Sequence, residues 1–175
     1  MRKTLLITLP LLFQMTLACA QNEVTVFLDW RIDDTVSLYD KPGGEILHRL
    51  ACKNDTNPDE VVMMTILALN DSMYQVSVFD DSAEIGIGWI YKNAPVRVCD
   101  RFYLPNNTLE IFRQPNGTKL IATLTETSDD DGLLQVVDVN LHNRWLKIRI
   151  KVGNKIIEGW IEPSSYCSNP YTTCG

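Results

Sequence analysis

The stretch that most constrains the fold runs from residue 144 to 162, RWLKIRIKVGNKIIEGWIE. Its first part, LKIRIK, alternates apolar and basic residues, which is the pattern of a strand with one buried face. Gly153-Asn154 tolerates the positive φ of a tight turn, and the chain then returns to Gly159-Trp160. The sequence therefore predicts a complete β-hairpin here.

The same plan occurs earlier in the chain. Residues 73–78 alternate in polarity and a polar turn follows before Gly-Trp-Ile at 88–90, and residues 36–50 (VSLYDKPGGEILHRL) match residues 109–124 (LEIFRQPNGTKLIATL). Corresponding residues keep nearly the same separation in three pairs: Pro42 and Pro115, Gly44 and Gly117, Trp89 and Trp160. We interpret this as an internal duplication, with one module at residues 21–100 and the other at 101–175.

The remaining segments also indicate strands. Residues 24–32 alternate strictly, and the apolar run at 61–69 (VVMMTILAL) is rich in residues that favour strands. A short helix at 61–69 is the alternative, which the flanking strands disfavour. Because no segment after residue 20 has sustained helical periodicity, we predict an all-β fold.

Residues 1–20 have the features of an export signal: Arg2 and Lys3, then a mainly apolar run, then small residues. Cleavage after Ala20 would release the mature chain. Cleavage before Cys19 would instead leave a lipidated cysteine, which would fix the chain to a membrane surface. We therefore expect an exported protein in the periplasm or at the cell surface, with lipid anchoring as the alternative.

The net charge of the whole chain is −6, and removal of the two basic residues of the signal would make it more negative. Binding to a phosphate backbone depends on basic patches. The charge therefore argues against nucleic acid as a partner, and we expect contact with a membrane only through an N-terminal lipid.

Four cysteines follow the signal, an even number that suits an oxidising compartment. They allow three pairings, of which we favour Cys52 with Cys99 and Cys167 with Cys174. The second bridge would clasp the C-terminal tail. Zinc is disfavoured because the spacing lacks a CxxC motif.

No residue pattern indicates catalysis. His48 and His142 are the only histidines, and neither has a serine or cysteine nearby in a recognisable nucleophile setting. Residues 129–132 (DDDG) resemble part of a calcium loop, but strands are expected where helices should flank it, so a solvated turn is the ordinary interpretation. We expect a protein that is not an enzyme and needs no cofactor or metal.

The order of a Pro/Gly turn, an apolar strand, a Trp-x-Lys-apolar strand and a Gly-Trp-Ile strand resembles the bacterial SH3 domain family. Residues 109–166 carry the better match, including Trp145-Leu146-Lys147-Ile148, whereas Met73-Tyr74-Gln75-Val76 stands there in the first module. The resemblance implies two tandem SH3-like small barrels, each partly open. It also implies a role in recognising cell-wall peptides or protein segments.

Aromatic residues in the expected strands suit the recognition of extended peptides. Tyr39 and Phe112 precede the Pro/Gly turns, while Trp89, Tyr91 and Trp160 belong to the Gly-Trp elements. Trp89 and Trp160 have a competing interpretation as covers of the core. We predict binding of a peptide or cell-wall fragment through these five residues, or, as the alternative, an envelope adaptor or inhibitor that binds a specific partner protein.

Overall fold

The computed structural model describes residues 23–55, 60–80, 83–101, 108–125 and 132–170. The predicted signal at residues 1–20, the candidate lipidation site Cys19, the aspartates at 129–131 and Cys174 all lie outside these residues. Below, the first half means the described residues up to 100, and the second half those from 101 onward.

The described residues fold into β-strands, with one 3-10 turn at Pro163–Ser165. No helix in this part of the chain has the length and apolar character needed to cross a membrane. The strands of the first half are β1 (Val24–Leu28), β2 (Thr35–Tyr39), β3 (Ile46–Ala51), β4 (Met63–Leu69), β5 (Met73–Asp80), β6 (Ala83–Tyr91) and β7 (Val96–Asp100). Those of the second half are β8 (Leu109–Phe112), β9 (Leu120–Leu124), β10 (Leu133–Asn140), β11 (Trp145–Val152), β12 (Lys155–Ile161) and β13 (Tyr166–Cys167).

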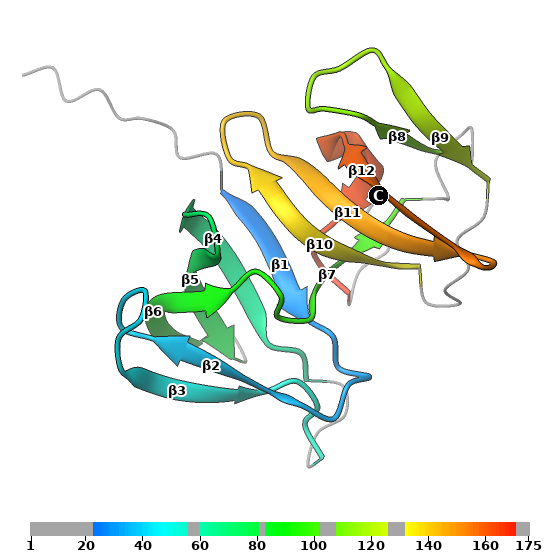
Figure 1. Ribbon diagram of the computed structural model, residues 1–175. Helices are drawn as coiled ribbons and strands as arrows, with labels where there is room; N and C mark the ends of the chain where they lie inside the picture. The colour runs from blue at the N-terminus through cyan, green and yellow to red at the C-terminus, as the bar shows by residue number, and fades with distance from the viewer. Residues whose placement is uncertain (1–22, 56–59, 81–82, 102–107, 126–131, 171–175) are drawn as a thin grey trace, which may run out of the picture.

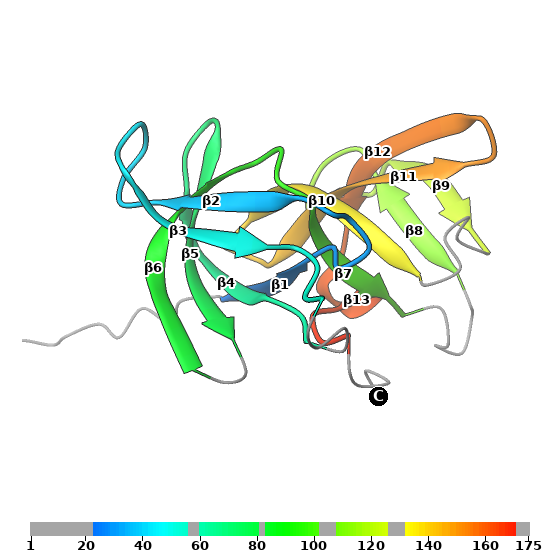
Figure 2. The same ribbon diagram turned by 90° about the horizontal axis from the view of Figure 1, so that it is seen from below.

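All strand pairs are antiparallel and belong to one sheet with the order β3-β2-β6-β5-β4-β1-β7-β10-β11-β12-β8-β9, while β13 pairs with β7 beside this path. The all-β prediction is confirmed. The sheet is continuous and open, with no closed barrel detected in the described part of the chain. Figures 1 and 2 show its two twisted halves meeting at β7, which lies between β1 and β10 in the strand order.

The strand order repeats between the halves. The path β4-β5-β6-β2-β3 of the first half has the same arrangement as β10-β11-β12-β8-β9 of the second. β1 pairs with β4 as β7 pairs with β10, and β1 and β7 also pair with each other. Register irregularities recur as well, between Ile66 and Ala68 in one half and between Val136 and Asp138 in the other.

The Pro/Gly turns have the same local geometry in both halves. Gly43 has a φ of 71° and Asn116 a φ of 55°, each directly after a proline. A backbone hydrogen bond closes each turn, from Gly44 N–H to the Lys41 carbonyl at 2.9 Å and from Gly117 N–H to the Gln114 carbonyl at 3.1 Å. Proline followed by a residue of positive φ is the arrangement of a type II turn.

The predicted hairpin at 144–162 is confirmed as β11 and β12. Gly153 has a φ of 57° in the turn, and Leu146, Ile148 and Ile150 are buried. The strand predicted at 61–69 is also present, as β4. The predicted strand at 24–32 is too long, because β1 ends at Leu28.

Most buried apolar side chains form one contiguous core to which both halves contribute. A smaller cluster of Phe27, Val61 and Leu133 lies across the sheet, since Phe27 points opposite to its neighbour Val26. Both Val26 and Phe27 are fully buried. The centre of the sheet is therefore covered on two faces, and the halves share their core.

Candidate functional site

The close packing of β6 against β2 positions the aromatic residues of the candidate site. A methyl group added at Gly88 would lie 2.6 Å from Leu38 Cγ and 2.7 Å from the Tyr39 carbonyl oxygen, far inside normal contact distance. Gly159 has the same relation to Ile111 and Phe112, at 2.5 Å and 2.8 Å. Glycine is thus needed at both positions because the neighbouring strand leaves no room for a side chain.

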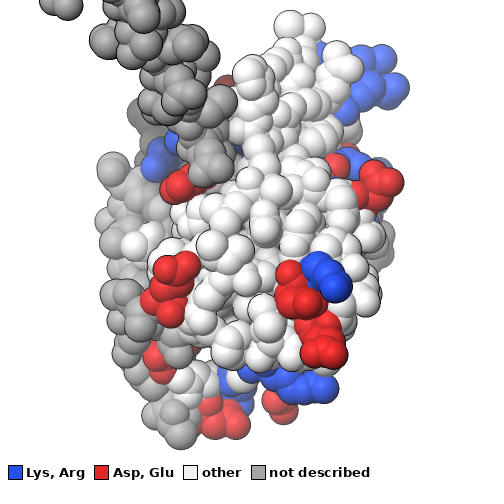
Figure 3. All heavy atoms as spheres, turned by 90° about the vertical axis from the view of Figure 1, so that its left-hand side faces the viewer, with Lys and Arg blue, Asp and Glu red and all other residues white. Residues whose placement is uncertain are grey.

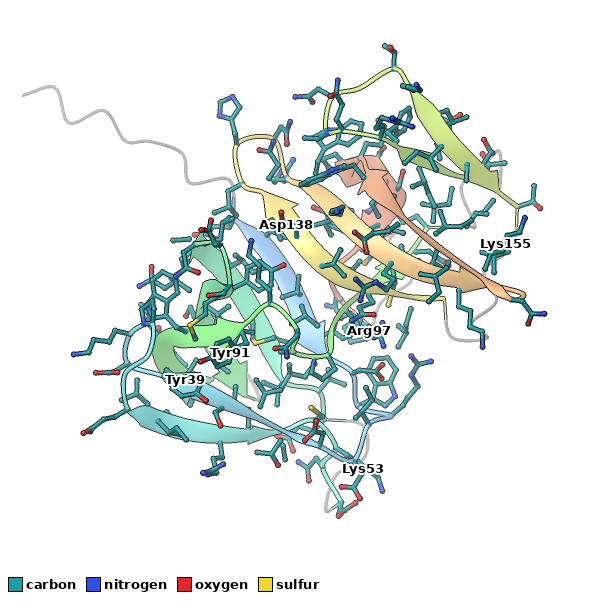
Figure 4. All side chains as sticks on the ribbon, viewed as in Figure 1. Tyr39, Lys53, Tyr91, Arg97, Asp138 and Lys155 are labelled. Atoms are coloured by element: carbon teal, nitrogen blue, oxygen red, sulfur yellow. The ribbon has the colours of Figure 1, made fainter. Side chains whose placement is uncertain are left out.

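The aromatic residues follow from this contact. Because Gly88 faces the core side chain of Leu38, the next residue, Trp89, points to the outer face of the sheet. Tyr39 is the direct cross-strand partner of Trp89, and Tyr91, two residues along β6, faces the same side. The rings of Tyr39 and Tyr91 are in edge-to-face contact, with centroids 5.6 Å apart and planes at 78°. Figure 4 shows these two side chains next to each other.

The tyrosine pair lines a pocket of about 250 Å³, which we call the Tyr39–Tyr91 groove. Tyr91 is 45% exposed. The groove runs from the start of β2 to the segment that joins β6 to β7, and its lining residues are Asp34, Thr35, Val36, Ser37, Tyr39, Tyr91, Asn93, Ala94 and Pro95. Aromatic rings and a proline next to a few polar groups are typical of ligand sites.

Backbone hydrogen bonds fix the wall formed by residues 91–95. Ala94 N–H donates to the Tyr91 carbonyl at 3.0 Å, and Asp29 N–H donates to the Pro95 carbonyl at 2.9 Å. Lys92 N–H donates to the Ser72 carbonyl at 2.9 Å. The segment that carries Tyr91 is therefore hydrogen-bonded to Asp29, which follows β1, and to Ser72 in the β4–β5 turn.

A buried carboxylate belongs to Asp29, the residue whose backbone is bonded to Pro95 of the groove wall. Asp29 is 1% exposed and pairs with Arg31 at 2.9 Å and with Arg97 of β7 at 2.8 Å. Burial by itself raises the pKa of Asp29, but the hydrogen bonds from Arg31 and Arg97 outweigh burial and hold the pKa below its usual value. Asp29 also ends β1, because its carbonyl accepts a turn hydrogen bond from Ile32 N–H at 3.2 Å.

The face of the molecule on the left of Figure 1 consists mostly of uncharged residues, as Figure 3 shows. This face belongs to the first half, where the β2–β3 hairpin and β6 lie (Figure 1). Apolar and neutral polar contacts would therefore dominate binding there, with Asp34 as the carboxylate in the groove lining.

The predicted aromatic residues of the second half have different surroundings. Phe112 is in edge-to-face contact with Trp145, with centroids 5.4 Å apart, and Trp145 is buried. Trp160 is the cross-strand partner of Phe112 and, like Trp89, is partly buried. Of the five predicted binding residues, Tyr39 and Tyr91 line the groove, Trp89 lies beside Tyr39, and Phe112 and Trp160 lie in the other half.

One carboxylate on β12 pairs with two of the three basic residues that alternate along β11 in the 144–162 hairpin. Glu158 pairs with Lys147 at 2.6 Å and with Arg149 at 2.8 Å. Hydrogen bonds from Lys147 and then Arg149 lower the pKa of Glu158. These two basic residues are therefore already engaged within the hairpin.

The predicted bridge between Cys52 and Cys99 is wrong. The Cys52 thiol is free and buried, and burial, followed by the charges of Asp34 and Asp29, raises its pKa to about 11. Cys99 lies elsewhere, on β7, opposite Leu133 and Cys167. The second predicted bridge stays a prediction, because Cys174 is outside the described residues.

The two histidines are both exposed. Among the described residues no group of three or more histidine, cysteine or acidic side chains could hold a metal ion. Asp138, which would take the last ligand position of a calcium loop built around Gly132, forms an ion pair with Lys92 at 2.7 Å.

Sequence reasoning missed part of the groove, namely Asp34, Asn93 and Pro95. Asp34 belongs to the Asp33-Asp34 pair, which was interpreted only as an interruption between two strands. Asn93 and Pro95 follow the Gly-Trp strand and are typical turn residues. This turn pattern is the sequence signal that could have pointed to them. No protein-family model, curated protein or solved structure matches this chain.

Proposed function

We propose that this chain is a non-enzymatic, extracytoplasmic binding protein that recognises a peptide or a cell-wall fragment through the Tyr39–Tyr91 groove. The observation that carries the proposal is the aromatic pair of the partly buried Tyr39 and the exposed Tyr91, which lines the groove together with Pro95. Rigid aromatic rings supply contact area at low entropic cost, and aromatic-lined grooves suit extended ligands.

The polar residues of the groove lining would fix the orientation of a bound ligand. The Asp34 carboxylate accepts a hydrogen bond from Thr35 N–H at 2.7 Å, and the Asp34 carbonyl accepts one from Cys52 N–H at 2.9 Å, which ties this loop to the end of β3. Ser37 and Asn93 add neutral hydrogen-bonding groups to the lining. A ligand with an apolar segment next to amide groups would match this combination.

We further propose that each half is an SH3-like module and that the modules are fused through β7, which pairs with both β1 and β10. The repeated strand order and the recurring contact of glycine with the neighbouring strand support this proposal. A location outside the cytoplasm rests on the signal-like residues 1–20. A non-enzymatic role is supported by the absence of a nucleophile setting around either histidine.

The alternative, an adaptor or inhibitor that binds one envelope protein, is favoured by the sheet edges. β3 and β9 end the strand order. They carry neighbouring aliphatic side chains that are 42% to 48% exposed, Ile46 and Leu47 on β3 and Leu120 and Ile121 on β9. A partner could add a strand to such an edge.

A retention experiment separates the two functions. The mature chain would be incubated with purified peptidoglycan and, separately, with envelope extract. Retention on peptidoglycan is the expected result, and Tyr91→Ser should weaken it about tenfold because a contact aromatic is lost. Ile156→Ser is the matched control, since Ile156 is 70% exposed on the distant 144–162 hairpin.

Equal retention of both variants would contradict the role of the groove. Capture of one envelope protein, lost with Leu47→Ser and retained with Tyr91→Ser, would replace the proposed function with the adaptor. Hydrolysis of wall peptides that His48→Ala or His142→Ala abolishes would overturn the non-enzymatic assignment.

A further inference from the structure

A second concave site lies where the two halves of the sheet meet. Its volume is about 590 Å³, within the usual range for sites that bind small ligands. The start of β1, the end of β7, the turn between β10 and β11, and the segment around β13 all contribute to its lining. We call it the junction pocket, and its charged lining residues are Glu23, Arg101 and Arg144.

Arg101 is held in this pocket with an unused donor. Its backbone N–H donates to the Ser165 carbonyl at 3.2 Å, while its Nε is buried without a hydrogen-bond partner. A buried donor left without an acceptor is costly, and such a group in a folded protein calls for an explanation. Contacts within the described part of the chain therefore do not satisfy all the donors of the Arg101 guanidinium group.

The contrast with other basic residues strengthens this point. Four basic side chains are partly buried in the described part of the chain. Three of them, Lys92, Arg97 and Lys147, form ion pairs with carboxylates. Arg101 is the fourth, and among the described residues no carboxylate pairs with it, although the chain is acidic overall.

Arg144 has an unusual backbone at the edge of the same pocket. Its φ is 60°, in the left-handed region that residues with a side chain rarely adopt. The Tyr166 hydroxyl holds this conformation by donating to the Arg144 carbonyl at 2.8 Å. Burial raises the pKa of Tyr166 to about 12, so the hydroxyl stays protonated and keeps donating. Strained backbone that is held by its surroundings tends to occur at binding sites.

We propose that the junction pocket binds a ligand through a single carboxylate group, which Arg101 and Arg144 contact together. The planar guanidinium group matches the geometry of a carboxylate. Phosphate shares this geometry, but its additional negative charge would be repelled by Glu23 in the same lining. The pocket therefore favours a monocarboxylate, either a small acid or the carboxyl end of a peptide.

This site is separate from the Tyr39–Tyr91 groove, because no residue lines both. The two sites can therefore be tested independently.

The test follows the Nε–Hε signal of Arg101 in 15N-labelled protein by NMR. The probes are acetate, N-acetyl-alanyl-alanine, the same dipeptide with an amidated C-terminus, and inorganic phosphate. We expect the Arg101 signal to shift to saturation with acetate or with the dipeptide acid. The probe that binds more tightly shows whether the natural ligand is a small acid or the carboxyl end of a peptide. The amidated dipeptide should bind at least about tenfold more weakly than the dipeptide acid.

Variants complete the test. Arg144→Gln should weaken binding of the preferred carboxylate about tenfold, because one of its two cationic partners is lost. Glu23→Gln should strengthen binding, because a negative charge is removed from the lining. Arg113→Gln is the control and should leave binding unchanged, since Arg113 is an exposed residue of the β8–β9 turn. Thermal unfolding would confirm that each variant is folded. Equal binding of the dipeptide acid and amide, tighter binding of phosphate, no effect of Arg144→Gln, or no movement of the Arg101 signal with either carboxylate would overturn the proposal.

Discussion

Lys92 Nζ lies 2.7 Å from Asp138 Oδ1, and this ion pair joins the first half of the sheet to the second. The same ammonium group lies 5.4 Å from the centre of the Tyr74 ring, close enough for a cation–π interaction. Both Lys92 and Asp138 are partly shielded from solvent, with side chains 17% and 37% exposed. Figure 4 shows Asp138 on the side of β10 that faces the first half.

A double-mutant cycle with Lys92→Met and Asp138→Asn should therefore give a coupling free energy of about 1 kcal/mol in chemical denaturation. Lys53 and Asp55 form the control pair, since their side chains are 50% and 81% exposed and should show no measurable coupling. A coupling free energy near zero for Lys92 and Asp138 would mean that this ion pair does not stabilise the junction.

Asp29→Asn should lower the free energy of unfolding by about 3 kcal/mol at neutral pH, because Arg31 and Arg97 lose their carboxylate. The folded-state pKa of Asp29 lies below the model-compound value of 3.8. Its contribution to stability is thus present above that value and is lost as the pH falls through the folded-state pKa.

Urea denaturation of the wild type and Asp29→Asn across acidic pH measures this effect. The two free energies of unfolding should converge as the pH falls. Asp71→Asn, at an exposed position of the β4–β5 turn, is the control. A difference between Asp29→Asn and the wild type that stays constant with pH would contradict this account.

Gly88→Ala and Gly159→Ala should each destabilise the protein by about 2 kcal/mol, because the added methyl group would collide with the facing strand. Thermal and urea unfolding provide the measurement. Gly153→Asn is the control, since its position is open and asparagine tolerates positive φ. If Gly88→Ala were as stable as the wild type, the tight contact between β6 and β2 would be in doubt.

Much of the fold could be predicted because the signals were local. The 144–162 hairpin has strict alternation and a turn pair suited to positive φ, and both features act within a few residues. β7 and β13 were not predicted as sheet members. β13 is only two residues long, and β7 forms a strand through its pairing with β1, β10 and β13, which are distant in the sequence. The pairing of β1 with β7 connects distant segments, and no local pattern encodes it.

The candidate site could be predicted in part for the same reason. Tyr39 and Tyr91 belong to strands with clear patterns, and their contact follows from the pairing of β2 with β6. Phe112 corresponds to Tyr39 in the repeat, but in its half it contacts Trp145. The orphan donor of Arg101 depends on the meeting of distant segments, and the sequence carries no sign of it.

The Cys52 thiol should resist alkylation in the native protein. With a pKa of about 11, roughly one molecule in ten thousand carries the thiolate at pH 7, and burial limits access further. Iodoacetamide labelling followed by peptide mass analysis should show Cys52 modified only after unfolding. Rapid native labelling, or a peptide joined by a Cys52–Cys99 bridge, would contradict the free, buried thiol.

The central claim, that the Tyr39–Tyr91 groove binds the ligand, is tested most directly by mapping where a ligand touches the protein. Backbone amide shifts of the 15N-labelled protein would be followed while a soluble digest of peptidoglycan is added. The account predicts that the largest shifts fall at residues 34–39 and 91–94. Largest shifts at Phe112 and Trp160, or along β3 and β9, would contradict it.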